Sequence, residues 1–586
     1  MQFYKRFRFI GLCLLLVLVL FICRLAQLQL FATESLSDEH VDLIRQSVEQ
    51  RTSEFVIDNG RGSFLYRNKE TMNPKQNQLV LFPFLKTVDW PANKVAKILH
   101  INANDLKQAV LNADKPFVFN QPSLHITSDQ KQQINALNLT GVHALSLNRD
   151  RFGLSAPYLI GITGENQSLV KKRYPDLLNK GMVSKQTTVG LTGLQRAFDP
   201  FLISRDQEKL LYHTTGTGQP MFEDSMRLSA IQNQNYFPLH IQTTINQSLQ
   251  DIAEQAVEQS NIDRGGVAIV DVSNSDLLAM VNRPKMMTND PFSGGHQNNM
   301  LTAKFPGSIF KVVTAAASIG HNIITNDQQY NCNLGVYGEE QADRQLGQLG
   351  FKDSFYQSCN YTFATLANRL MKTDLQVMED YADKLGLTGR SGWSGDVFHI
   401  NDLRQFPEEQ ANTIWQSEDD KHSKKAIAQT AIGQLNVKLT PLSVVNMMAT
   451  IARGGQKKEV RAASKILYNN KSMPMTTFPS HEQDGKTLAP YTIMKLQSLL
   501  RGVVTDSEGT AHSLNKLPMP IAGKSGTAET DGAKNYHWFA GYFPADDPQY
   551  AMVVANFSSQ KGEETVYDVF GNIIKQMSKQ KQAETS

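Results

Sequence analysis

The sequence predicts an α+β fold. An antiparallel sheet with helices packed on it fills the C-terminal half, an elongated N-terminal domain precedes it, and one transmembrane helix begins the chain. Three observations lead to this prediction. Strand-like segments stand at both ends of the C-terminal half around a mainly helical middle, which is typical of one antiparallel sheet covered by helices. The composition changes near Leu239, where polar, mixed sequence gives way to clear strand and helix patterns. A continuous apolar run occupies residues 9–23.

The apolar run is typical of a membrane anchor. Crossing a bilayer takes about twenty apolar residues, and the Leu-rich sequence after Arg24 extends the span to residues 9–30. A cleaved signal peptide is the alternative, but no small-residue cleavage site follows the run. Basic residues before the run predict a cytoplasmic tail of residues 1–8 and a single-pass protein of the cell membrane with the remaining chain on the extracytoplasmic side.

Composition excludes some classes of protein. Of 586 residues, 41% are hydrophobic and 20% charged, which suits globular domains and excludes wholesale disorder. The net charge of +3 is too small to indicate a nucleic-acid partner, and no basic, aromatic-rich stripe is present.

The four cysteines give no metal-binding pattern. None has the CxxC spacing of a zinc site, and no pair of histidines has a matching spacing, so no metal or cofactor is expected. Cys332 and Cys359 can pair if this part of the chain faces an oxidising compartment. Free thiols are nevertheless the favoured expectation, with Cys359 as a small packing residue.

Residues 31–235 form the predicted N-terminal pedestal domain. Helical periodicity occurs in residues 37–51 and in residues 91–113, where turn residues interrupt it. Two Gly-punctuated segments follow at residues 147–164 and 189–202.

Residues 236–578 form the second predicted domain, and residues 579–586 are a polar tail. The first elements of this second domain are a strand and a helix, followed by a hairpin whose turn is residues 274–276. Helices follow to about Arg390, and the charged residues 400–425 are expected to be loop. The remaining elements, in order, are helices in residues 439–455 and 489–504, a strand in residues 521–529 and a hairpin in residues 536–557.

Three polar clusters interrupt this apolar domain. Ser308 and Lys311 stand three residues apart at the start of a helix that is hydrophobic all round, which is typical of a buried helix. The second cluster is Ser358-Cys359-Asn360, and the third, residues 524–527, is Lys-Ser-Gly-Thr on a predicted edge strand. Each alone is weak, because a helix cap, a turn or a strand end explains it. Their order and context together favour nucleophilic catalysis, with a serine activated by an amine.

These motifs resemble those of the penicillin-binding proteins and serine β-lactamases, which carry Ser-x-x-Lys, Ser-x-Asn and Lys-Ser/Thr-Gly. Residues 265–284, 432–455 and 537–544 are also similar to the transpeptidase domain. The N-terminal segments resemble the class B (monofunctional) pedestal of Gram-positive type. Residues 61–68 are a degenerate form of its RGxIxDRNG segment, with Tyr66 in place of Asp, and Lys69 follows in place of Gly. No segment matches the glycosyltransferase motif of class A proteins, so polymerisation of glycan strands is not expected.

The resemblance implies a peptidoglycan D,D-transpeptidase with an acyl-enzyme on Ser308, which β-lactams would also acylate. Lys311 would be the general base, with its pKa depressed by burial and by a second cation. Gly526 is expected to leave room for substrate backbone along the strand. The resemblance also implies that Ser358 relays a proton to the departing D-alanine and that Asn360 forms a hydrogen bond with the substrate backbone. Lys524 would tune the electrostatic field of the site, and Ser525 and Thr527 would bind the terminal carboxylate of the substrate. The backbone N–H groups of Ser308 and Thr527 would stabilise the oxyanion. His537 is expected on a sheet face or at the substrate rim.

Other functions stay open at this point. A D,D-carboxypeptidase or β-lactamase would use water in place of the acceptor amine, and no Glu is marked by sequence as a deacylating base. A catalytically weak scaffold or a β-lactam sensor is the non-enzymatic alternative, although the motifs are intact. The implied partners are donor and acceptor stem peptides, β-lactams, the membrane and a membrane glycosyltransferase of wall synthesis.

Overall fold

The computed structural model describes most of the chain and divides it into two compact units. It describes residues 2–27, 52–121, 124–147, 155–204, 207–213, 215, 227–229, 236–287, 297–325, 327–339, 341–530, 535–558 and 563–585. The second unit joins Arg61–Asn73 and Asp150–Arg205 to Asn233–Ser586, so two N-terminal segments pack with the C-terminal half. The domain limits predicted from the sequence stay a prediction.

The chain begins with helix α1 (Gln2–Ala26), whose Arg6–Ala26 portion has a mean hydropathy of 2.9 and is long and apolar enough to cross a membrane. Residues 28–30 of the predicted span, and the helix predicted at residues 37–51, lie outside the described residues.

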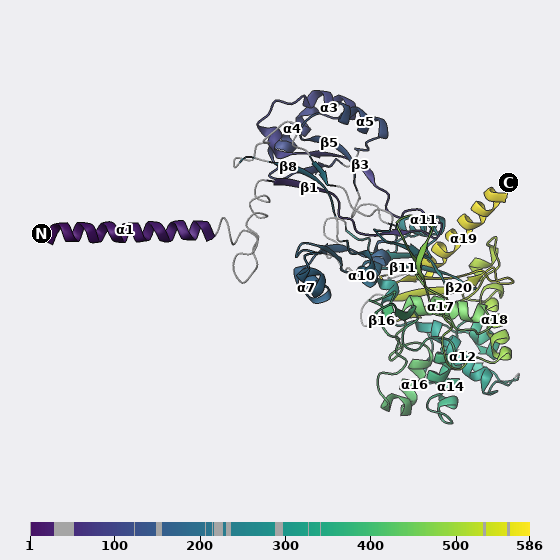
Figure 1. Cartoon of the computed structure of the whole chain (residues 1–586). Helices are drawn as coiled ribbons and strands as arrows, with labels where there is room; N and C mark the ends of the chain where they lie inside the picture. Colours follow the sequence, from purple (N-terminus) through teal and green to yellow (C-terminus); the bar gives the residue numbers. More distant parts are fainter. Residues whose placement is uncertain are drawn as a thin grey trace. The chain divides into compact units, whose positions relative to one another are not determined.

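The first unit contains two small antiparallel sheets with helices on one of them (Figure 1). The predicted helical region 91–113 is confirmed as two helices, α3 and α4. His100 ends α3 in the left-handed conformation, with φ of 56°, and the Asn102 side chain caps α4. The helices of this unit are α3 (Ala92–Leu99), α4 (Ala103–Leu111) and α5 (Ser128–Ala136), and its strands are β1 (Thr52–Asp58), β3 (Gln76–Leu81), β4 (Phe117–Phe119), β5 (Val142–Leu147), β8 (Glu208–His213) and β9 (Arg227–Ser229).

A buried ion network holds the N-terminal segments of the second unit together. The Arg61 guanidinium lies 2.8 Å from a carboxylate oxygen of Asp199, and Arg173 lies 2.9 Å from the other oxygen. Strand β2 (Ser63–Leu65) then pairs in parallel with β10 (His240–Thr243), and β17 (Ala463–Leu467) and β18 (Pro474–Thr477) complete this sheet. The remaining elements of these segments are α6 (Pro157–Ile160), β6 (Thr163–Glu165), α7 (Gln167–Arg173), α8 (Pro175–Asn179), β7 (Thr188–Gly190), α9 (Gly193–Ala197) and α10 (Asp199–Leu202).

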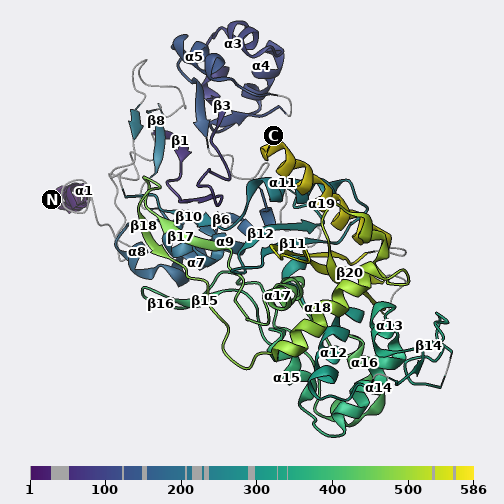
Figure 2. The ribbon, with the colours of Figure 1, turned by 90° about the vertical axis from the view of Figure 1, so that its right-hand side faces the viewer.

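The central sheet of the second unit is antiparallel, with strand order β12-β11-β21-β20-β19. Helices cover both faces, α11 and α19 on one and α17 and α18 on the other (Figure 2). This confirms the predicted α+β arrangement and both predicted hairpins. The strands are β11 (Gly265–Asp271), β12 (Leu277–Arg283), β19 (Ala522–Ala528), β20 (Tyr536–Phe543) and β21 (Tyr550–Asn556), and the covering helices are α11 (Gln247–Glu258), α17 (Pro441–Ala452), α18 (Pro490–Thr505) and α19 (Glu563–Thr585).

One local prediction is wrong. The expected loop at residues 400–425 contains β16 (Ile400–Arg404), which pairs with β15 (Ser394–Val397), and the first two residues of α16 (Lys424–Ala431). Helix α19 continues through the predicted polar tail as far as Thr585, and its apolar face, including Phe570, is buried on the sheet. The other helices between the hairpins are α12 (Lys311–Gly320), α13 (Phe351–Tyr356), α14 (Asn360–Met371) and α15 (Val377–Lys384).

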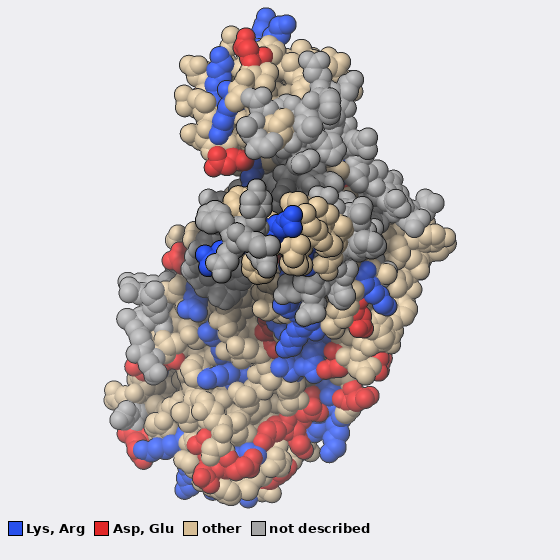
Figure 3. Space-filling view, turned by 60° about the vertical axis from the view of Figure 1, so that its left-hand side comes forward, with Lys and Arg blue, Asp and Glu red and all other residues tan. Residues whose placement is uncertain are grey.

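The surface carries both signs of charge. On the face shown in Figure 3, the described Lys and Arg side chains are interspersed with Asp and Glu side chains. This distribution fits the small net charge of +3.

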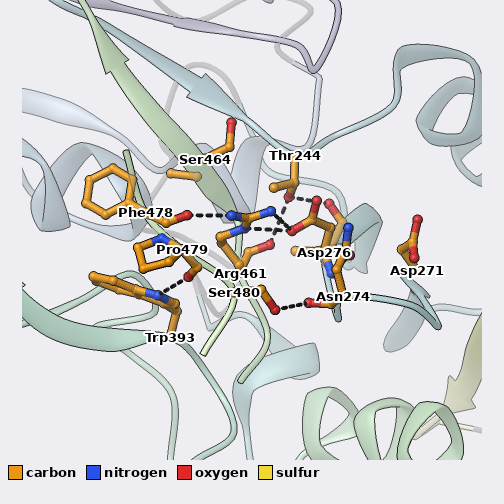
Figure 4. Close-up of polar contacts among 12 residues, drawn as sticks. Thr244, Asp271, Asn274, Asp276, Trp393, Arg461, Ser464, Phe478, Pro479 and Ser480 are labelled. Atoms are coloured by element: carbon orange, nitrogen blue, oxygen red, sulfur yellow. Dashed lines mark hydrogen bonds and ion pairs between the residues drawn. The ribbon is translucent and has the colours of Figure 1, made fainter. Parts of the chain in front are cut away.

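A polar cluster fixes the turn of the β11–β12 hairpin (Figure 4). The guanidinium of Arg461, on the segment before β17, donates to the buried carboxylate of Asp276 at 2.7 Å and also to the carbonyl of Phe478. The Ser480 hydroxyl donates to the carbonyl of Asn274 at 2.9 Å. The hairpin that begins the central sheet is therefore tied to the neighbouring β10–β17–β18 sheet.

Candidate active site

Ser308 lies in the first turn of a continuous buried helical segment. The 3-10 helix η4 (Gly307–Phe310) leads directly into α12, and side chains three residues apart eclipse in a 3-10 turn. Gly307 has φ of 55°, and a Cβ on it would stand 2.1 Å from the carbonyl oxygen of Thr527. Only glycine permits this approach, so the sequence before Ser308 places it beside strand β19.

Lys311 is fully buried, and its amine meets three oxygens of the second motif. The Nζ atom lies 2.7 Å from the Ser358 carbonyl, 3.1 Å from the Ser358 hydroxyl and 2.6 Å from Asn360 Oδ1. Burial lowers the pKa of Lys311 well below its ordinary value, and the charges of Lys524 and Arg344 lower it further. The expectation of a depressed lysine pKa is therefore supported by burial and by a second cation.

The Lys311 amine donates in all three of these contacts, to the Ser358 carbonyl, to the Ser358 hydroxyl oxygen and to Asn360 Oδ1. Lys524 Nζ donates to the same hydroxyl oxygen at 3.1 Å and to the Ser525 carbonyl at 3.1 Å. The Ser358 oxygen thus links the two lysines, and every polar atom of the trio has a complementary partner.

The structure shows no direct hydrogen bond between Ser308 and Lys311. Within the part of the chain that the structure describes, the half-buried Ser308 hydroxyl bonds no other group. The amine that is expected to act as the base is instead held by the three oxygens of the second motif. Catalytic hydrogen bonds are often long in unliganded sites and tighten when substrate binds.

The third motif lies on the edge strand β19, as predicted. Lys524 and Ser525 are buried, and Thr527 is half-buried. A Cβ on Gly526 would stand 2.5 Å from the Pro306 carbonyl oxygen and 2.7 Å from Ile309. The missing side chain makes room for η4, which carries Ser308. The expected room for substrate backbone along this strand stays a prediction.

The next strand supports this packing. Trp538 pairs with Gly526 across β19 and β20, and its indole N–H donates to the Phe305 carbonyl at 3.1 Å. His537 pairs with Thr527 and is buried on the sheet. Trp538 therefore supports the segment that leads to Ser308, whereas the neighbouring His537 faces the other side of the sheet.

The structure adds a residue that sequence reasoning missed. Thr510 follows α18, and its hydroxyl accepts a hydrogen bond from the Ser525 hydroxyl at 2.9 Å. The sequence offers only a weak signal for it, a Gly-Thr pair in the turn before the third motif.

Cys332 and Cys359 form a disulfide, so the expectation of free thiols is wrong. Cys359 lies between Ser358 and Asn360 as the N-cap of α14, and Ser358 has φ of 62°, an uncommon conformation for a non-glycine residue. Both cysteines are buried beside Tyr330 in a small cluster. The bond ties the middle of the second motif to the β13 strand (Tyr330–Asn331), a tertiary contact that cysteine spacing alone cannot reveal.

Comparison with known proteins identifies the family. The penicillin-binding protein transpeptidase domain matches residues 265–575, more than half of the chain. The chain belongs to this family. No group of three or more His, Cys, Asp or Glu side chains among the described residues could hold a metal ion.

Three relatives are named peptidoglycan D,D-transpeptidases or penicillin-binding proteins. Peptidoglycan D,D-transpeptidase FtsI of Escherichia coli is 23% identical, over 95% of this chain and 88% of the relative. Penicillin-binding protein 3 of Bacillus subtilis is 23% identical, over 81% of this chain and 70% of the relative. Peptidoglycan D,D-transpeptidase PbpA of Mycobacterium tuberculosis is 24% identical, over 54% of this chain, and the match spans 66% of that protein's length.

A solved structure has a similar fold over nearly the whole chain. A chain from a study of a peptidoglycan synthase complex that coordinates polymerization and crosslinking has a TM-score of 0.63 with this chain. Its identity is 19%, over 97% of this chain and 98% of that chain. At this identity the likeness shows the fold.

Proposed function

We propose that this penicillin-binding protein is a peptidoglycan D,D-transpeptidase that works through an acyl-enzyme on Ser308. One observation carries the proposal: the Ser358 hydroxyl is bonded by the amines of both Lys311 and Lys524, beside the helix start that presents Ser308 to β19. Three segments far apart in sequence therefore form one serine–lysine site. The names of two relatives, peptidoglycan D,D-transpeptidases, support the same reaction.

The first half-reaction forms the acyl-enzyme. Neutral Lys311 takes the proton as Ser308 Oγ bonds to the carbonyl carbon of the penultimate D-alanine, and the N–H groups of Ser308 and Thr527 would stabilise the oxyanion. Collapse of this tetrahedral intermediate breaks the peptide C–N bond. The Ser358 hydroxyl gives its proton to the departing D-alanine and regains a proton from Lys311. Asn360 Oδ1 is occupied by Lys311, so its amide N–H₂ would bond the substrate backbone.

The second half-reaction forms the cross-link. An amine of a second stem peptide attacks the ester carbonyl and gives up a proton, which passes through the Ser358 hydroxyl to neutral Lys311. The ester C–O bond then breaks, and Lys311 returns that proton to the alkoxide of Ser308. Lys524 supplies positive charge to the site throughout, while Ser525 and Thr527 would bind the carboxylate of the donor peptide. A β-lactam acylates Ser308 in the first half-reaction and stays there.

The acylation rate should fall at low pH, because the base must be uncharged. The pKa of Lys311 is lowered from 10.5, so acylation is present above that lowered pKa and lost as pH falls through it. The rate constant for labelling by a fluorescent penicillin, measured from about pH 5 to about pH 10, should rise about tenfold per pH unit and then level off well below 10.5. A rise that continues to the ordinary lysine pKa would exclude Lys311 as the depressed base.

Product analysis tests the reaction itself. The full-length protein in detergent is given a peptide ending in D-Ala-D-Ala with and without an amine acceptor, and products are identified by mass spectrometry. We expect D-alanine release with a new amide bond to the acceptor. Release with water as the only acceptor would indicate the alternative D,D-carboxypeptidase, and rapid turnover of bound penicillin would indicate a β-lactamase. Absence of both release and labelling would indicate a scaffold.

The setting of the reaction is also a proposal. The disulfide beside the second motif supports an extracytoplasmic location for the site, because disulfides persist in oxidising compartments. Helix α1 would anchor the chain in the membrane. A membrane glycosyltransferase of wall synthesis is the proposed partner. Sequence resemblance favours a protein of the penicillin-binding protein 4b type of bacilli.

A further inference from the structure

Helix α13 ends in a turn that carries Ser358 in the left-handed conformation. The Cys359 N–H donates to the Ser354 carbonyl at 2.8 Å, and the Ser358 N–H donates to the Phe355 carbonyl at 3.3 Å. These two bonds form a Schellman motif, whose left-handed position is usually glycine. Ser358 occupies that position with φ of 62°, at a cost of about 1–2 kcal/mol. The surroundings of the turn must therefore hold Ser358 in this conformation.

Three other segments bond the remaining carbonyls of this turn. The Tyr356 carbonyl accepts from a backbone N–H in the turn after α18 at 3.1 Å, and the Ser358 carbonyl accepts from Lys311 at 2.7 Å. The Gln357 carbonyl, between them, accepts from the guanidinium of Arg344 at 3.1 Å. Arginine near a helix C-terminus is favourable because it bonds a carbonyl that the helix leaves unpaired. Arg344 therefore caps α13 one residue before Ser358.

The segment that carries Arg344 is itself fastened to the second motif. Three residues after Arg344, the Gly347 carbonyl accepts from the Cys332 N–H at 2.8 Å. Cys332 forms the disulfide with Cys359, the residue after Ser358. Arg344 and the disulfide therefore hold the two residues that flank Ser358.

Arg344 also places positive charge near the base. Burial lowers the pKa of Lys311, and the charges of Lys524, on β19, and of Arg344 lower it further. No carboxylate is among the described groups that shift this pKa, and the Phe363 ring of α14 lies 5.7 Å from the amine. Lys524 is fully buried, whereas Arg344 is exposed, so salt screens the charge of Arg344 more strongly than that of Lys524.

We propose that Arg344 is a positioning residue of the acylation site, which caps α13 and so holds Ser358 where its carbonyl and hydroxyl meet the Lys311 amine. The assignment rests on the proposed function. Loss of the guanidinium frees the turn, and the amine loses the alignment of two of its three partners. The maximum acylation rate then falls. Loss of the positive charge also moves the rising limb of the pH–rate profile to higher pH, because Lys311 stays charged to a higher pH.

The test measures the rate constant for labelling by a fluorescent penicillin against pH, for the full-length protein and two variants. Arg344→Met keeps the aliphatic stem and removes the guanidinium, and Arg344→Lys keeps the charge. For Arg344→Met we expect the plateau rate to fall about threefold or more and the rising limb to move up by about half a pH unit. Arg344→Lys should keep the limb near its wild-type position. Salt at about 1 M should remove most of the shift in Arg344→Met and leave the loss of plateau rate.

Arg369→Met is the matched control, because Arg369 of α14 is also exposed and donates to the Gln328 side chain at 3.0 Å. It should leave both the plateau and the limb unchanged. Thermal unfolding is followed in parallel, and Arg344→Gln replaces the methionine variant if that variant does not fold.

The size of the labelled fraction separates positioning from a merely structural role. An Arg344→Met protein whose labelled fraction falls while its rate constant and limb match the wild type would overturn the role of Arg344. The same change in rate in Arg369→Met would also overturn it. Wild-type protein that penicillin does not label would instead overturn the proposed function, and this assignment with it.

Discussion

Replacement of Ser308 by alanine is expected to abolish covalent labelling by penicillin, with a loss of at least about 10³-fold in acylation rate. The fold should survive, because the Ser308 hydroxyl bonds no other described residue and its loss leaves no buried group unsatisfied. Labelling is measured by gel fluorescence and the adduct is located by mass spectrometry. Thermal unfolding should remain within about 2 °C of the wild-type midpoint.

Ser318→Ala is the matched control for Ser308→Ala. Ser318 lies on the same continuous helical segment, is fully buried, and donates to the Thr314 carbonyl at 2.8 Å, so it shares the helix but not the site. It should label at the wild-type rate. Labelling that persists in Ser308→Ala would place the nucleophile elsewhere and remove the basis of the proposed mechanism.

Local patterns predicted the secondary structure where a segment carries its own turn or cap. The β11–β12 hairpin follows from two apolar runs around Asn274, and the break between α3 and α4 follows from the turn residues inside residues 91–113. The β15–β16 pair was missed because it is a short two-stranded ribbon whose few apolar residues, such as Val397 and Leu403, do not form an apolar alternation. The parallel pairing of β2 with β10 joins segments far apart in sequence, and no local pattern contains that information.

The candidate site was predicted through residue type, not through contacts. The sequence marks Ser358 and Lys524, and the structure brings their side chains into contact with each other, but the catalytic roles stay a prediction. Thr510 and the Cys332–Cys359 bond depend on tertiary packing, which residue spacing does not encode.

Residues 61–69 depart from the RGxIxDRNG pattern of the class B pedestal, and the structure shows how the chain accommodates one of these changes. Lys69, where glycine is usual, has φ of 70°, so the left-handed conformation remains although the residue has changed. The N–H of Lys69 donates to the Tyr66 carbonyl, which holds the turn. A non-glycine residue in this region costs on the order of 1 kcal/mol, and packing of the buried Tyr66 offsets part of it.

Replacement of Asp199 by alanine is expected to produce the largest loss of stability in the second unit. One buried carboxylate accepts hydrogen bonds from four donors: Arg61, Arg173, the Tyr174 hydroxyl and the Gly190 N–H. Removing one partner of a buried ion pair costs about 3–5 kcal/mol, because the other charge is left uncompensated. Thermal unfolding of the full-length protein should show a clearly lower midpoint, and urea unfolding a loss of about 3 kcal/mol or more.

A second substitution separates the loss of the ion pair from the loss of packing. Arg61 is buried, and its pKa is lowered by burial even with Asp199 present, so the uncompensated guanidinium is the main cost. Arg61→Met in the Asp199→Ala background should therefore recover part of the stability, whereas Asp176→Ala, an exposed aspartate on α8, should change it by less than about 0.5 kcal/mol. None of the four donors belongs to the three motifs, so the folded fraction of Asp199→Ala should still acylate at the wild-type rate. A double variant as unstable as Asp199→Ala would mean that packing around α10, rather than the buried charge, holds this part of the fold.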